Sequence, residues 1–177
     1  MNHPELVARI EELARRYFDQ VPDAVELWVH TQLVRRFAVQ LARIEGADAE
    51  ALEIAALLHD IGKCKGLENH SMASRELSEA LLRSFNLPEG TKQLILECVL
   101  EHSSRFASED SKVEVKVIQS ADALALFFDD AWQEYSKKNL TKEAISELID
   151  ISMTKVRLES ARKIAEPQVA KLRASLL

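Results

Sequence analysis

Hydrophobic residues recur at steps of three and four along almost the whole chain, which is the repeat of an α-helix with one buried face. Only four glycines and four prolines interrupt the 177 residues, so few positions favour tight turns. The periodic segments lie at about 6–17, 24–45, 49–60, 71–85, 88–103 and 113–137, followed by a long segment from Thr141. The sequence therefore predicts an all-α fold, a bundle of about six to eight helices.

The chain shows no internal repeat, no low-complexity tract and no linker long enough to separate domains. Its length suits one domain with its own hydrophobic core, so a single domain over residues 1–177 is predicted. The segment from Thr141 onward is amphipathic, with Ile145, Leu148 and Ile149 on one face. We expect the C-terminal helices, residues 141–177, to pack on the rest of the core, with a homodimer interface as the alternative.

The net charge of −6 argues against binding to large nucleic acids or to anionic membranes. No apolar run is long enough to cross a membrane, and the N-terminal residues do not resemble a signal peptide. Two cysteines are too few for a disulfide framework and suit a reducing compartment. A cytoplasmic location without a membrane partner is expected.

Three histidines and two aspartates lie on or beside helical faces that are otherwise apolar. Each of four segments carries one such face, and Asp60 directly follows one of the histidines. The faces are His30 with Val34, Phe37, Leu41 and Ile44; His59 with Leu52, Ala55 and Ala56; His102 with Leu94 and Cys98; and Asp122 with Val115, Ile118 and Ala125.

A buried carboxylate without a positive partner is strongly disfavoured, and no lysine or arginine lies on these four faces. A metal ion held by His30, His59, Asp60 and Asp122 would satisfy all of these groups at once. Taken singly, each residue has an ordinary reading, such as a half-buried helix histidine for His30. The set as a whole indicates a metal site, and mixed nitrogen and oxygen ligands suit Mn, Fe, Co, Ni or Zn.

Two local motifs accompany these residues. Residues 57–63 read Leu-Leu-His-Asp-Ile-Gly-Lys, and residues 120–124 read Ser-Ala-Asp-Ala-Leu. Together with the upstream His30 they resemble the HD superfamily of metal-dependent phosphohydrolases over about residues 25–130. The resemblance implies an HD-domain helical bundle in which His30, His59, Asp60 and Asp122 bind a divalent metal, Mg among the candidates.

Some members of that superfamily carry two further histidines and bind two metals. His70 and His102 resemble this pair, with Asp60 as the shared bridge. The short loop between Asp60 and His70 leaves an alternative open, in which His70 only bonds the first turn of a helix. The site is therefore expected to hold one or two ions.

The resemblance also suggests roles in the reaction. Asp60 can orient the attacking water or take its proton, and Lys63 can neutralise a substrate phosphate. Arg105 is a weaker candidate for substrate binding, since its ordinary reading is a solvated loop residue. Small relatives often have a second acid before the Ala-Asp pair, where this chain has Gln119 and Ser120.

The expected function is hydrolysis of a nucleotide or another small phosphorylated metabolite, as a phosphomonoesterase or a nucleotide pyrophosphohydrolase. The main alternative is a di-iron oxygenase of the same fold that cleaves a C–C or C–P bond, which would need His70 and His102 as ligands. A non-catalytic helical binding module is a third reading, and the complete set of core ligands argues against it.

Overall fold

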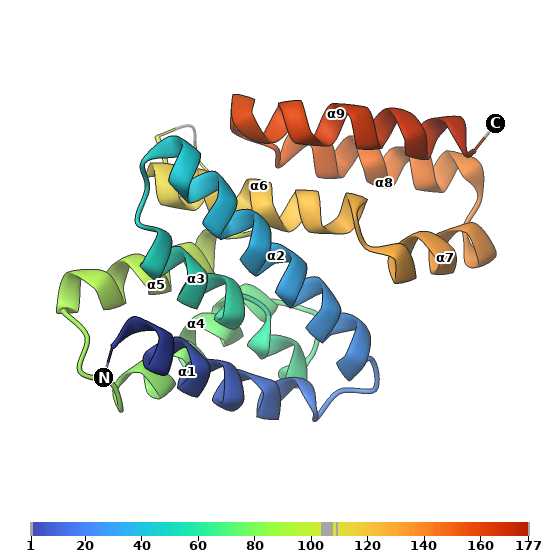
Figure 1. Ribbon diagram of the computed structural model, residues 1–177. Coiled ribbons are helices and arrows are strands. Elements are labelled where there is room, and N and C mark those ends of the chain that lie inside the picture. Colours follow the sequence, from blue (N-terminus) through green and yellow to red (C-terminus); the bar gives the residue numbers. More distant parts are fainter. Residues whose placement is uncertain (1, 104–107, 109, 177) are drawn as a thin grey trace.

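The computed structural model describes residues 2–103, 108 and 110–176 (Figure 1). Over these residues the chain forms nine α-helices and one short 3₁₀ helix with no strand, which confirms the all-α prediction. The elements are α1 (His3–Phe18), α2 (Ala24–Glu45), α3 (Ala49–Leu58), η1 (Ile61–Lys65), α4 (His70–Leu82), α5 (Glu89–Glu101), α6 (Val113–Phe127), α7 (Asp130–Asn139), α8 (Lys142–Thr154) and α9 (Glu159–Ala174).

The long helices α2 and α6 pack against each other at the centre of the molecule (Figure 1). Helices α3 and α5 pack on this pair, α1 covers α2, α3 and η1, and α4 lies against η1 and α5. Helices α8 and α9 lie side by side and pack on α6. The buried hydrophobic core draws on residues of α1, α2, α3, α5, α6, α8 and α9 among others.

Local sequence signals set several helix ends. Gly46 ends α2 in the left-handed conformation at φ 69°, where a side chain would be strained. The side chains of Asp48 and Thr141 accept hydrogen bonds from the first turns of α3 and α8. These caps explain why the boundaries expected from the sequence agree with the structure at these points.

Two boundaries differ from the sequence prediction. The periodic segment 113–137 is two helices, because the chain turns after Phe127 and the Asp129 side chain caps α7 by accepting from the Trp132 N–H. At the other end, a proline inside a helix is expected to kink or break it, but α9 continues through Pro167 and the segment from Thr141 is interrupted after Thr154 instead. Pro167 lies on the exposed face of α9, where water can satisfy the carbonyl that loses its partner.

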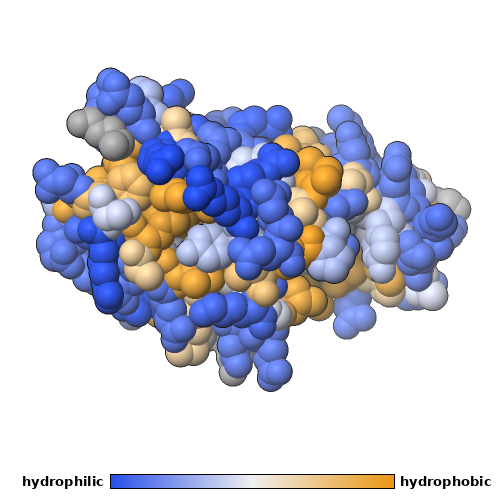
Figure 2. All heavy atoms as spheres, turned by 90° about the horizontal axis from the view of Figure 1, so that it is seen from below, coloured by the Kyte–Doolittle hydropathy of each residue, from blue (hydrophilic) through white to orange (hydrophobic). Residues whose placement is uncertain are grey.

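The molecular surface mixes polar and apolar side chains. Seen from below, hydrophobic areas lie between hydrophilic ones (Figure 2). Tyr135, Leu148 and Ile151, on α7 and α8, are among the exposed large hydrophobic side chains. Within the described ranges no helix combines the length and apolarity needed to cross a membrane.

Candidate metal centre

The first ligand group joins three helices. His30 comes from α2, His59 directly follows the last residue of α3, and Asp122 lies in the middle of α6. The His30 Nε2 atom lies 3.0 Å from Asp122 Oδ1, and the His59 Nε2 atom lies 4.0 Å from the same oxygen. One ligand atom from each of these residues lies within 4.8 Å of the others, which is close enough for all three to contact one ion.

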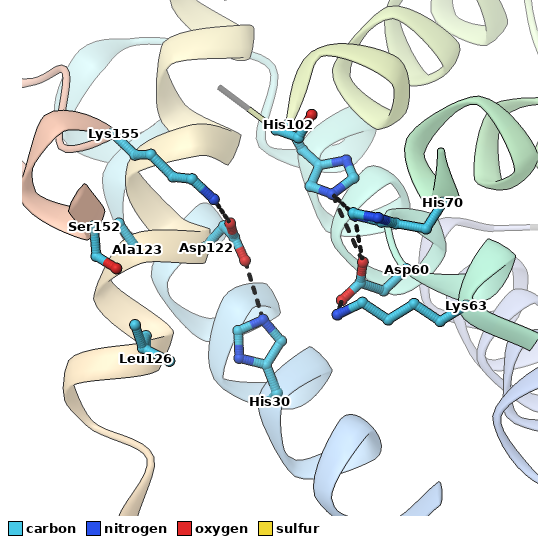
Figure 3. A pocket seen from close by; sticks show the side chains of 11 residues that line it. His30, Asp60, Lys63, His70, His102, Asp122, Ala123, Leu126, Ser152 and Lys155 are labelled. Carbon is cyan, nitrogen blue, oxygen red and sulfur yellow. Dashed lines mark hydrogen bonds and ion pairs between the residues drawn. The ribbon is translucent and has the colours of Figure 1, made fainter. Parts of the chain in front are cut away.

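The second ligand group consists of Asp60, His70 and His102. His70 is the first residue of α4, and His102 follows the last residue of α5. Both Nε2 atoms lie 3.6 Å from Asp60 Oδ1, and they lie 3.3 Å from each other (Figure 3). The structure therefore brings His70 and His102 to Asp60, and the short loop after Asp60 does not prevent this.

The two groups are neighbours. Asp60 also approaches the first group, because its Oδ2 atom lies 3.3 Å from His59 Nε2. Its two oxygens thus face different groups, as the bridging role inferred from the resemblance requires. All six residues predicted as metal ligands therefore lie in one place.

Backbone hydrogen bonds orient three of the histidines. In each, the Nδ1 atom lies near the carbonyl oxygen three residues earlier: His59 to Ala56 at 2.7 Å, His70 to Leu67 at 3.0 Å and His102 to Val99 at 2.7 Å. A carbonyl only accepts, so Nδ1 carries the proton and Nε2 is left bare in the neutral ring. This is the tautomer that a metal-binding histidine needs.

Bare polar atoms show that the residues fit a cation. The His59 Nε2 and Asp60 Oδ1 atoms are buried and make no hydrogen bond within the described part of the chain. The Nε2 atoms of His70 and His102 face each other with their lone pairs, which is unfavourable unless a proton or an ion lies between them. A divalent metal at each group would satisfy these atoms.

The protonation states also suit metal binding. Burial and the neighbouring His59 lower the pKa of His102 to about 4, so this ring is neutral at pH 7. Burial opposes ionisation of Asp60, but the charges of His59 and Lys63 outweigh it and hold the pKa of Asp60 well below its usual range. Burial lowers the pKa of His59, but the charges of Asp60 and Asp122 raise it more.

Two lysines accompany the carboxylates. The Lys63 Nζ atom lies 2.5 Å from Asp60 Oδ2, and the Lys155 Nζ atom lies 3.1 Å from Asp122 Oδ2. The pKa of Asp122 is held well below its usual range, since the Lys155 charge and the His30 hydrogen bond outweigh its burial. Lys63 was expected here from the sequence, whereas Lys155 was not.

The inward position of Lys155 could have been predicted from the pattern of α8, although its contact with Asp122 could not. The buried residues Ile145, Ile149 and Ser152 define the inner face of α8, and Lys155 follows on the same face three residues later. This face carries no histidine or aspartate, the residues from which the metal site was predicted. Arg105, the other predicted substrate-binding residue, lies outside the described residues.

Five of the six predicted ligands, all except the buried His59, line a cavity of about 250 Å³. Lys63 lines it beside Asp60, and Lys155 lines it beside Asp122 on the opposite side (Figure 3). Ala123 and Leu126 of α6 form an apolar part of the wall. A substrate in this cavity would lie next to the predicted ligands, within reach of both lysines and of a small apolar surface.

Comparison with known proteins identifies the architecture. The sequence model of the HD domain matches residues 27–126, more than half of the chain. A crystal structure of a predicted HD superfamily hydrolase from an uncultured Thermotogales bacterium superimposes with a TM-score of 0.71 at 23% identity, covering 99% of this chain and 95% of that one. The comparison with curated proteins gives no match.

Proposed function

The chain belongs to the HD domain family, and from this premise we propose that it is a metal-dependent phosphohydrolase acting on a small phosphorylated substrate. The observation that carries the proposal is the meeting of two ligand groups, linked through Asp60, in a cavity flanked by two lysines. The structural relative is itself described as a predicted hydrolase, which is consistent with this assignment.

The formal charge of the site favours an anionic substrate. With neutral histidines, Asp60 and Asp122 are balanced by Lys63 and Lys155. Each divalent ion adds two positive charges, which leaves the loaded cavity strongly positive. A phosphate monoester dianion would neutralise the charge added by one ion or halve the charge added by two, and a neutral substrate would do neither.

The chain's own residues account for binding and proton handling. A divalent metal supplies a Lewis acid and an activated water when it is bound. Asp60 then lies where it can orient that water or take its proton, since its two oxygens face both groups. The Lys63 ammonium lies beside Asp60 and can contact a phosphoryl oxygen.

The size of the cavity favours a compact substrate. Pockets for drug-sized ligands usually measure roughly 300–1,000 Å³, and this cavity measures about 250 Å³. A phosphoryl group with a small leaving group fits this volume, whereas a nucleotide would have to extend outside it. We therefore place phosphomonoesterase activity on a small metabolite ahead of nucleotide pyrophosphohydrolysis.

The six-residue ligand set also keeps the oxygenase alternative open. Such an enzyme needs His70 and His102 near Asp60, and both are there. Metal analysis with oxygen-consumption assays separates the two functions. A coupled di-iron centre that consumes oxygen would favour the oxygenase, and phosphate release with several divalent metals would favour the hydrolase.

We expect phosphate release from small monoesters when the protein is loaded with Mn, Mg, Co or Ni, and none after chelation. The same ions should raise the melting temperature, because binding at 100 times Kd stabilises a protein by about 2.7 kcal/mol. A metal-independent esterase activity or an unchanged melting temperature would contradict the proposal.

Lys63→Ala tests substrate binding separately from metal binding. Lys63 contacts Asp60 and lines the cavity but is not a predicted ligand, so we expect kcat/KM to fall about ten- to hundredfold with metal content unchanged. Lys65→Ala is the matched control, because Lys65 is an exposed residue of the same 3₁₀ helix. Loss of the metal in Lys63→Ala would show that Lys63 supports the ligands instead.

A further inference from the structure

The C-terminal helices reach into the metal cavity through one side chain. Lys155 lies at the end of α8, outside residues 27–126 that match the HD domain. Its Nζ atom lies 3.1 Å from Asp122 Oδ2, and the residue lines the same cavity as the metal ligands. A segment beyond the matched region thus contributes a positive charge next to the proposed reaction centre.

The position of Lys155 is fixed by its neighbours. Val156 is completely buried, and the Arg157 N–H donates a 3.0 Å hydrogen bond to the Ser120 hydroxyl on α6. These contacts hold the turn between α8 and α9 against α6. The contact point on α6, Ser120, lies two residues before Asp122. The lysine therefore starts from an anchored backbone, and only its side chain, 24% exposed, is free to adjust.

Pairing with Asp122 does not by itself explain a lysine at this point. Asp122 already contacts His30 at 3.0 Å, and a metal at the first group would provide its counter-charge. Next to that metal, the ammonium group experiences repulsion that an anion in the cavity would relieve. The cation is therefore best explained by an anionic ligand that occupies the cavity together with the metal.

We propose that Lys155 is a substrate-binding residue that contacts an anionic oxygen of the phosphoryl group from the side opposite Lys63. This inference rests on the proposed function and deepens it. The two lysines would hold the phosphoryl group between them and select a fully ionised phosphate monoester. The helices α8 and α9 then complete the substrate site in addition to packing on the core.

Lys155→Met tests this role, because methionine keeps most of the side-chain volume and removes the charge. In metal-loaded protein we expect the Kd for inorganic phosphate, measured by calorimetry, to rise about ten- to hundredfold with metal content unchanged. Lys155→Arg should recover most of the affinity. Lys163→Met is the matched control, since Lys163 is exposed on α9.

A structural role would give different results. If Lys155 only balances Asp122, Lys155→Met will change metal content or melting temperature and leave the phosphate Kd of the loaded protein within twofold of the wild type. That result overturns the inference. The inference is also overturned if the wild type hydrolyses monoesters and Lys155→Met has the same KM and kcat. In that case the proposed function survives.

A measurement on the wild type removes any dependence on the folding of the variant. Inorganic phosphate should protect Lys155 and Lys63 of the loaded protein from an amine-acylating reagent, followed residue by residue with mass spectrometry, and should leave Lys163 unprotected. Equal acylation of Lys155 with and without phosphate would refute the inference. Protection without any ester hydrolysis would instead uphold the anion site and count against the proposed reaction.

Discussion

Asp60→Asn is expected to lose bound metal and to reduce turnover by about 10³-fold. Asp60 is the residue that approaches both ligand groups, with one oxygen 3.3 Å from His59 Nε2 and the other 3.6 Å from both His70 and His102. A bound metal stabilises a phosphoryl transition state by several kcal/mol, and about 4 kcal/mol corresponds to about 10³ in rate. Asparagine keeps the shape but removes the negative charge that two divalent ions would share.

The measurements are metal content after dialysis, by elemental analysis, and the steady-state rate of phosphate release. Asp19→Asn is the matched control, because Asp19 is exposed at the end of α1 and pairs with Arg15. An Asp60→Asn protein with wild-type metal content and rate would show that the metal centre lies elsewhere. His59→Ala should behave in the same way, since its buried Nε2 atom has no other described hydrogen-bond partner.

Gly62→Ala is expected to destabilise the protein and to disturb the second ligand group. A Cβ atom at Gly62 would lie 2.4 Å from both the His70 carbonyl oxygen and the Ser74 nitrogen, and 2.8 Å from the Ala73 carbonyl carbon. All three are backbone atoms of α4, so the helix itself would have to move. Overpacking of this kind costs roughly 1–3 kcal/mol, which corresponds to a fall in melting temperature of roughly 2–12 °C for a chain of this size.

The displacement would begin at His70, the first residue of α4, and would carry its ring away from Asp60. We therefore expect Gly62→Ala to retain less metal than the wild type, with the loss confined to one ion per chain. Gly90→Ala is the control, because nothing lies within 4 Å of the added Cβ and alanine favours the helix. Equal melting temperatures for Gly62→Ala and the wild type would refute the predicted clash.

The sequence predicted well which side chains come together, because helical periodicity fixes the direction in which a side chain points. His30 and Asp122 share faces with core residues of α2 and α6, and these two helices pack together, so both side chains had to point inward. His59 and Asp60 sit at the end of a helix whose described residues are mostly buried. In each case the hydrophobic pattern of one helix was enough to predict that the side chain points inward.

Other features depend on contacts that no local pattern encodes. Lys155 lies 33 residues after Asp122 and reaches it only because the turn between α8 and α9 docks on Ser120. The Ser120 hydroxyl accepts the Arg157 N–H, a contact that the local sequence around Ser120 does not indicate. The break after Phe127 was missed because neither glycine nor proline marks it.

The histidines with Nδ1 hydrogen bonds sit at helix ends, where backbone opening begins in most proteins. A pair of ions, one in each ligand group, would link α2, α3, α4, α5 and α6 as a crosslink does. Their removal should therefore expose the junctions around His59, His70 and His102 to a protease before the rest of the chain unfolds. The rate of cleavage at these junctions would report on how much of the protein holds metal, independently of any assay of turnover.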